Sequence, residues 1–241
     1  LRQMADEFKY HLSTRGKRKP PINSNARVKI IQIQTCEEIT SRVVQKARKE
    51  RVTINSVVNA AVLLSVQKHL YGGAESLYRY MSMADLRPYL EPVPPAHQMG
   101  GYVSPMRYTI QVFADDDLWS LAQRINDQIY KGMKKGERFL ASIMSELFLR
   151  ITFSLNRFRM CTTAISYTGS PLHPSQSYES FKIKTIRGNV SNFGVGPEFS
   201  GLVGLYDDEL RWDMLYLDSD MDQEGAQQIA DEIEHILESA V

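Results

Sequence analysis

The segment 53–70 constrains the fold more than any other part of the chain. Its apolar residues cover most of the circumference of a helix. Thr53 or Asn55 can cap the start of this helix, and Gly72 followed by Gly73 ends it. A helix that is apolar on most sides has to be buried within a packed domain. The residues concerned are Val57, Val58, Ala60, Ala61, Leu63, Leu64, Val66 and Leu70.

Strand and helix patterns alternate along most of the chain. β-Branched residues alternate over 27–34 and predict a strand, and Thr35 is a good N-cap for the amphipathic helix that follows. Three aspartates at 115–117 suit the positive end of a helix dipole and lack the spacing of a calcium loop, so they predict a helix start and no metal site. Further strands are predicted at 77–83, 102–113, 161–167, 181–186, 199–206 and 209–217, and further helices at 139–153 and 223–237.

This order of elements predicts the fold class. It is α/β or α+β, with a mixed sheet covered by helices, and Asp207-Asp208 is a plausible hairpin turn between the last two strands. The first 25 residues differ from the rest, because 1–12 reads as a short helix and 13–25 is a polar stretch broken by Gly16, Pro20 and Pro21. We expect that stretch to be a surface linker.

Charge and cysteine usage exclude several classes of function. The 29 Lys and Arg residues nearly balance 28 Asp and Glu residues, so a net charge of +1 gives no bulk reason to expect nucleic acid or an anionic membrane as partner. The apolar runs are shorter than the roughly 18 residues of a membrane span. Cys36 and Cys161 lack CxxC spacing and predict reduced thiols, so we expect a cytoplasmic protein.

The residues show no catalytic centre by themselves. Five histidines are scattered along the chain, and none has another histidine within one helical turn. The sequence contains no GxSxG, GxxxxGK[ST], HExxH or GxGxxG motif. The sequence therefore predicts no general base and no metal centre in this chain. The histidines are His11, His69, His97, His173 and His235.

Four segments, taken in order, carry a resemblance to a known family. They are VTINSVVNAA at 52–61, ADLRPYL at 84–90, GGYVS at 100–104 and NFGVGP at 192–197. Together they resemble the C-terminal half of the chloramphenicol-acetyltransferase-like superfamily. That superfamily includes condensation domains of nonribosomal peptide synthetases, the BAHD acyltransferases and related alcohol O-acyltransferases.

The resemblance implies one lobe of a two-lobed fold. In such proteins each lobe is a mixed sheet covered by helices, and the general base belongs to an HHxxxDG motif at the end of the first lobe. The present sequence has no HHxxxDG. The resemblance therefore implies that 26–241 is a C-terminal lobe, and that 1–25 is a helix and linker from an N-terminal lobe missing from this chain.

Arg87 is the first site residue that the resemblance implies. An arginine in the DLR segment of the family forms a supporting salt bridge with the aspartate of HHxxxDG, and two parallel hydrogen bonds from a guanidinium suit such a carboxylate. The alternative is that Asp85 and Arg87 are ordinary loop charges before Pro88.

Two further segments supply candidate substrate-binding residues. ISYTG at 165–169 resembles the family's VSNxG strand end, so Ser166 or Thr168 would bind the acyl donor, although small polar residues that cap a strand explain them equally well. NFGVG at 192–196 is similar to the DFGWG motif, with Asn for Asp and Val for Trp, which singles out Asn192 and Gly194. A glycine-containing loop explains these two residues as well.

The implied function is that of the C-terminal lobe of an acyltransferase. The complete enzyme would move an acyl group from acyl-CoA, or from a carrier-protein thioester, to an alcohol or amine of a secondary metabolite. It would need no cofactor besides the pantetheine thioester as co-substrate. The lobe alone would be inactive and poorly soluble. The alternatives are a non-catalytic lobe that binds a partner or carrier protein, and part of a peptide-synthetase condensation domain.

Overall fold

A computed structural model of the chain describes residues 10, 25–95, 97–154, 159–169, 180, 187–190, 197–206 and 208–241, without the side chains of 148 and 151–154. The strand predicted at 181–186 lies outside the described residues, and of the helix predicted at 1–12 only Tyr10 is described, as helical. The elements are β1 (Val28–Gln34), α2 (Glu37–Lys49), α3 (Ile54–Tyr71), β2 (Ser76–Asp85), η1 (Arg87–Tyr89), β3 (Val103–Val112), α4 (Leu118–Lys134), α5 (Glu137–Ser154), β4 (Thr163–Tyr167), β5 (Phe199–Tyr206), β6 (Glu209–Leu217) and α6 (Gln223–Ser239).

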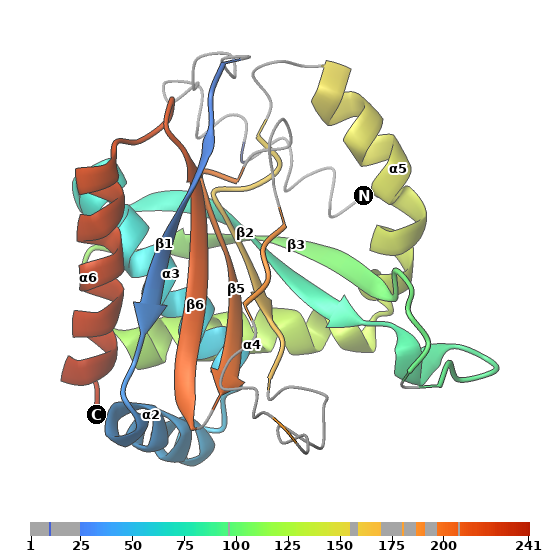
Figure 1. The fold of residues 1–241 in the computed structure, drawn as a ribbon, viewed down its shortest axis with the longest axis horizontal. Coiled ribbons are helices and arrows are strands. Elements are labelled where there is room, and N and C mark those ends of the chain that lie inside the picture. Colours follow the sequence, from blue (N-terminus) through green and yellow to red (C-terminus); the bar gives the residue numbers. More distant parts are fainter. Residues whose placement is uncertain are drawn as a thin grey trace.

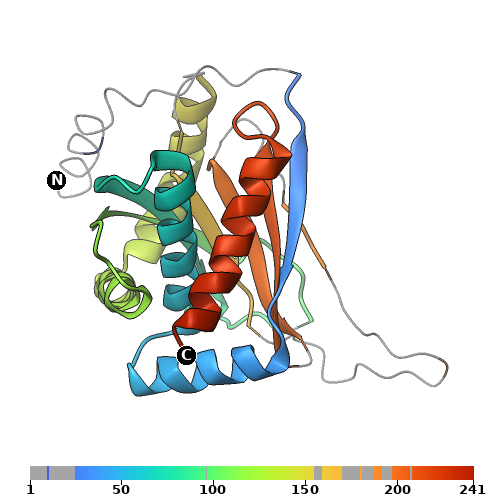
Figure 2. The ribbon, with the colours of Figure 1, turned by 90° about the vertical axis from the view of Figure 1, so that its left-hand side faces the viewer.

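Six strands form one mixed sheet in the order β1-β6-β5-β4-β2-β3. The pairs β1/β6, β5/β6 and β2/β3 are antiparallel, whereas β4 is parallel to both β2 and β5. Helices α3, α4 and α6 lie on one side of this sheet, and α2 runs below it (Figure 1, Figure 2). The predicted fold class, a mixed sheet covered by helices, is confirmed.

The buried helix predicted at 53–70 is α3, and it lies at the centre of the core. Its N-cap is Thr53, whose side chain accepts a hydrogen bond from the amide of Ser56, and it ends at Gly72, whose φ of 62° is left-handed. Tyr80, Phe199 and Trp212, from three different strands, belong to the same hydrophobic core. The alternation of side chains along each strand therefore turns one face of the sheet toward α3.

The predicted helix caps are only partly correct. The α2 helix begins one residue later than predicted, with Cys36 as its N-cap and no side-chain capping bond. The prediction that Thr35 caps this helix is wrong, because the Thr35 hydroxyl is hydrogen-bonded to the carbonyl oxygen of Leu210 at 3.3 Å and ties β1 to β6. Asp117 does cap α4, by accepting from the amides of Trp119 and Ser120.

Helix α5 stands apart from the helical layer. It contacts β3 and α4, at the edge of the sheet where β3 is the outermost strand, and it rises beside the sheet in Figure 1. Several of its large apolar side chains are exposed to solvent. They are Phe139, Leu140, Ile143, Leu147 and Leu149.

Candidate functional site

The parallel strands bring three of the predicted site residues, Arg87, Ser166 and Thr168, to one end of the sheet. Because β2, β4 and β5 run in the same direction, their carboxyl ends lie along the same end of the sheet. Arg87 follows the end of β2, and Thr168 directly follows the end of β4. Ser166 lies near the end of β4, where it pairs with Leu202 of β5. We call this region the carboxyl edge.

Arg87 is held in place by its immediate surroundings at the carboxyl edge. Its backbone amide donates to Asp85 Oδ1 at 3.0 Å, and its Nη1 lies 3.7 Å from the same oxygen. The guanidinium carbon lies 4.8 Å from the centroid of the Tyr102 ring. The amide of Leu86 donates to the carbonyl oxygen of Tyr102 at 2.8 Å, so the residue before Arg87 is tied to the residue before β3.

The guanidinium of Arg87 keeps unused hydrogen-bonding capacity. The side chain is 28% exposed, and its Nε is buried without a hydrogen-bond partner. One distant contact to Asp85, itself 55% exposed, leaves most of the five N–H donors of the guanidinium free. A stacked guanidinium with free donors can receive a second carboxylate with two parallel hydrogen bonds.

A second arginine supports this edge from α5 and was missed by the sequence analysis. The guanidinium carbon of Arg138 lies 3.8 Å from the Tyr89 ring centroid and 4.6 Å from that of Phe139. The hydroxyl of Ser104 donates to the carbonyl oxygen of Arg138 at 2.5 Å. Arg138 therefore joins α5, the DLR segment and the start of β3. No local pattern indicates this role, because Tyr89 and Ser104 lie far from Arg138 in the sequence.

Thr168 is engaged in strand pairing. Its amide donates to the carbonyl oxygen of Val203 at 2.8 Å, and its hydroxyl donates to the same oxygen at 3.1 Å. This hydroxyl therefore stabilises the end of the strand, which is the alternative to a role in binding the acyl donor. Ser166 is half-buried in β4.

The other two candidate residues, Asn192 and Gly194, lie outside the described residues. After them, the chain enters β5 at Phe199, which pairs with Thr163 at the start of β4. The first residue of β5 therefore lies at the amino ends of the parallel strands, opposite the carboxyl edge that holds Arg87.

The described histidines do not assemble a catalytic centre. His69 Nε2 lies 3.3 Å from a carboxylate oxygen of Glu232, and His235 Nε2 lies 3.5 Å from the hydroxyl of Ser239. Within the described ranges, no group of three His, Cys, Asp or Glu side chains is arranged to hold a metal ion. Over the same ranges, no helix is both long and apolar enough to cross a membrane.

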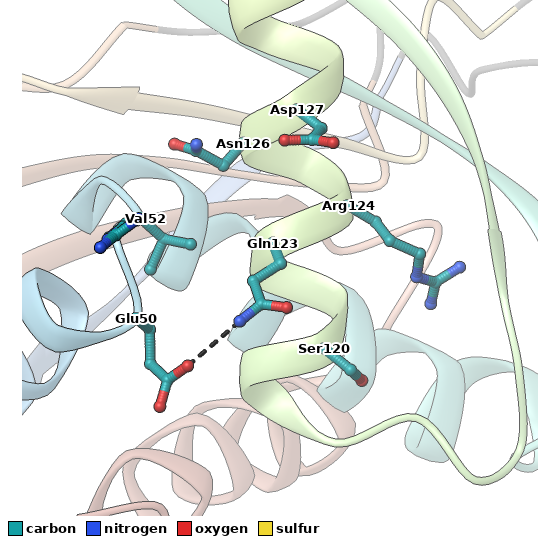
Figure 3. Close-up of a pocket in the computed structure, with 8 residues that line it drawn as sticks. Glu50, Val52, Ser120, Gln123, Arg124, Asn126 and Asp127 are labelled. Carbon is teal, nitrogen blue, oxygen red and sulfur yellow. Dashed lines mark hydrogen bonds between the residues drawn. The ribbon is translucent and has the colours of Figure 1, made fainter.

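The structure also has an open hollow of about 510 Å³ on the helical side (Figure 3). Gln123 of α4 donates to a carboxylate oxygen of Glu50 across it at 3.1 Å, and Asn126 accepts from the amide of Thr53 at 3.2 Å. These contacts join α4 to the turn between α2 and α3. The lining holds none of the predicted site residues; it consists of Glu50, Arg51, Val52, Ser120, Gln123, Arg124, Asn126 and Asp127.

Solved structures of other proteins share this fold. A trichothecene 15-O-acetyltransferase from Fusarium sporotrichioides matches with a TM-score of 0.67 and 13% identity, over 99% of this chain and 53% of that one. Polyketide synthase associated protein 5 from Mycobacterium tuberculosis matches with a TM-score of 0.63 and 15% identity, over 92% and 56%.

A third similar structure, the X-domain from teicoplanin biosynthesis in complex with OxyB, has a TM-score of 0.64 and 13% identity, over 92% of this chain and 47% of that one. The chain thus spans about half the length of these proteins. The fold is that of the chloramphenicol-acetyltransferase-like acyltransferases and condensation domains, and the chain fits their C-terminal lobe.

The family itself is shown by sequence. The profile described as "Phthiocerol/phthiodiolone dimycocerosyl transferase C-terminus" matches residues 24–152, more than half of the 241-residue chain. The chain belongs to this family of acyltransferase C-terminal domains. No curated protein matches the sequence. The resemblance drawn from the four sequence segments is confirmed at the level of the family and the fold.

Proposed function

We propose that the chain is the C-terminal lobe of an acyltransferase, with residues 26–241 forming the lobe and 1–25 leading into it from an N-terminal lobe. The observation that carries the proposal is Arg87, a partly exposed guanidinium that is stacked on Tyr102 at the carboxyl edge and has only a distant contact, of 3.7 Å, to Asp85. Its free donors suit the aspartate of an HHxxxDG motif on the other lobe, where Arg87 would act as a positioning residue.

The proposed reaction is acyl transfer from a thioester to an alcohol or amine of a secondary metabolite. A histidine of the other lobe takes the proton from the acceptor as its oxygen or nitrogen attacks the thioester carbonyl. The new C–O or C–N bond forms, the C–S bond breaks, and the proton passes to the leaving thiolate. The donor is acyl-CoA or a carrier-protein thioester. A cytoplasmic location belongs to the same proposal, and the free thiols of Cys36 and Cys161 fit it.

The exposed apolar side of α5 is a second observation in favour of a partner lobe. Phe139, Leu140 and Ile143 are 40%, 48% and 78% exposed, and Tyr89 beside them is 45% exposed. Apolar surface of this kind is characteristic of an interface. A second lobe that reaches Arg87 would approach the edge to which Tyr89 and α5 belong.

The experiment begins with the coding sequence around this segment. An in-frame HHxxxDG upstream supports the proposal. The encoded protein is then assayed for release of free CoA from acetyl-CoA, with octanol and octylamine as acceptors. Release that depends on the second histidine of the motif is the expected result. An intact first lobe without such a motif would contradict the proposal.

A non-catalytic partner-binding lobe is the second candidate. The observation that favours it is the similarity to the X-domain, which was solved in complex with another protein, OxyB. Co-purification of a stable partner, together with no thioester cleavage by the full protein, would support this candidate over the first.

A further inference from the structure

A cluster of buried polar side chains lies at the edge of the sheet opposite Arg87. Arg79 of β2 is only 1% exposed, and Glu198, just before β5, is 6% exposed. Thr162 joins them, because its carbonyl oxygen accepts from the amide of Glu198 at 3.0 Å and its hydroxyl oxygen accepts from the amide of Arg79 at 3.4 Å. We call these three residues the polar cluster. Buried charges are costly unless neighbouring groups satisfy and cover them.

Helix α3 covers one side of the polar cluster. The hydroxyl of Tyr71, the last residue of α3, donates to Glu198 Oε2 at 2.6 Å. The Tyr71 ring meets the Tyr78 ring edge-on, with the centroids 5.4 Å apart. Burial and the adjacent Glu198 carboxylate raise the pKa of Tyr71, so its hydroxyl remains a donor.

Tyr10 covers the cluster from another part of the chain. Its ring centroid lies 4.0 Å from the guanidinium carbon of Arg79, which is the geometry of a cation–π contact. Burial raises the pKa of Tyr10, against the opposing effects of a hydrogen bond with the Thr162 side chain and of the Arg79 charge. Tyr10 therefore contacts the polar cluster in two ways: its ring lies over the Arg79 guanidinium, and its hydroxyl is hydrogen-bonded to Thr162.

We propose that the polar cluster is a docking site for Tyr10, and that this side chain anchors its part of the chain there. The polar cluster offers a cation to the face of the Tyr10 ring and a hydroxyl to its phenol, so a tyrosine fits both parts. The inference concerns contacts within this chain, and it holds whether or not the full protein transfers acyl groups.

Cys161 provides a reporter for this docking. It is fully buried, directly precedes Thr162, and burial raises the pKa of its thiol to about 12, whereas Cys36 is exposed. In a chain with Cys36→Ser, the rate of modification by dithionitrobenzoate measures how often Cys161 becomes accessible. Tyr10→Ala should raise this rate about tenfold, because the cation–π contact and the covering ring are lost.

Two matched variants complete the experiment. Tyr10→Phe keeps the ring over Arg79 and should retain most of the protection of Cys161. Tyr130→Ala removes a tyrosine that is 58% exposed and should leave the rate unchanged. A natively folded Tyr10→Ala chain in which Cys161 reacts as slowly as before would overturn the proposal, as would equal acceleration by Tyr130→Ala.

A second measurement covers the case in which Tyr10→Ala does not fold. Hydroxyl-radical footprinting of the chain with its natural tyrosines should oxidise Tyr10 about fivefold more slowly than Tyr130. Equal oxidation of the two residues would show that Tyr10 is not seated on the cluster.

Discussion

Glu232 shows how single charged side chains hold the helical layer together. Its carboxylate oxygen lies 2.7 Å from Lys68 Nζ and 3.3 Å from His69 Nε2, so α6 is tied to α3. Partial burial raises the pKa of this carboxyl, but the hydrogen bonds and charges of Lys68 and His69 outweigh that effect and lower it below its usual 4.5. The ionised form of Glu232 therefore stabilises the folded chain.

The Glu232→Gln variant should lose this stabilisation in a pH-dependent way. Because the folded-state pKa is depressed, the stabilisation is fully present above pH 4.5 and is lost as the pH falls through the lowered value. Lys68 is exposed and solvent screens it, so the expected cost is about 0.5–1 kcal/mol at neutral pH. Urea titrations at several pH values measure it, with exposed Glu238→Gln as the control. A cost that persists unchanged well below pH 4.5 would contradict the assignment.

At the scale of residues, the sequence predicts helix-capping residues better than it predicts contacts between distant side chains. Thr53 and Asp117 are local caps, and each was predictable from the residues that follow it. The role proposed for Arg87 rests on a family resemblance, since nothing nearby in the sequence shows that Tyr102 stacks on it. Thr35 failed as a predicted cap because a distant strand uses its hydroxyl.

At the scale of elements, α3 is the part of the fold that the sequence defines most completely. Leu63 is fully buried, whereas its neighbour Leu64 is only partly buried at the margin of the same core. Leu63→Ala should cost about 2–5 kcal/mol of unfolding free energy, because it removes contacts and leaves a cavity. Leu64→Ala is the matched control and should cost clearly less. Denaturant unfolding of both variants checks this, and equal losses would mean that α3 is not packed as described.

The pairing of the strands was not predictable from the sequence. Alternation and caps locate β1, β3 and β5 nearly to the residue, since they are local properties. The parallel placement of β4 between β2 and β5 depends on contacts across more than 80 residues of chain, as between Tyr80 and Thr163. This placement is what brings Arg87 and Thr168 to one edge, so the site could not be assembled without the structure.

At the scale of the whole molecule, the exposed face of α5 should govern the behaviour of the chain in solution. Ile143 is 78% exposed in the middle of that face. Ile143→Glu should reduce self-association, because it breaks the apolar surface with a charge. Light scattering against concentration measures this, with Val190→Glu, a change at an exposed valine outside α5, as the control. If both variants associate as strongly as the parent chain, α5 is not the surface responsible.

The claim that Arg87 positions the catalytic loop of a second lobe can be tested by the rate of acyl transfer in the full protein. Arg87→Ala should lower kcat about a hundredfold with little change in KM for acetyl-CoA, because a displaced base loop loses its alignment. Arg87→Lys should recover only part of the rate, since an ammonium cannot form two parallel hydrogen bonds with a carboxylate. Arg42→Ala, an exposed change on α2, is the control and should be neutral. Unchanged kcat in a folded Arg87→Ala protein would contradict the claim.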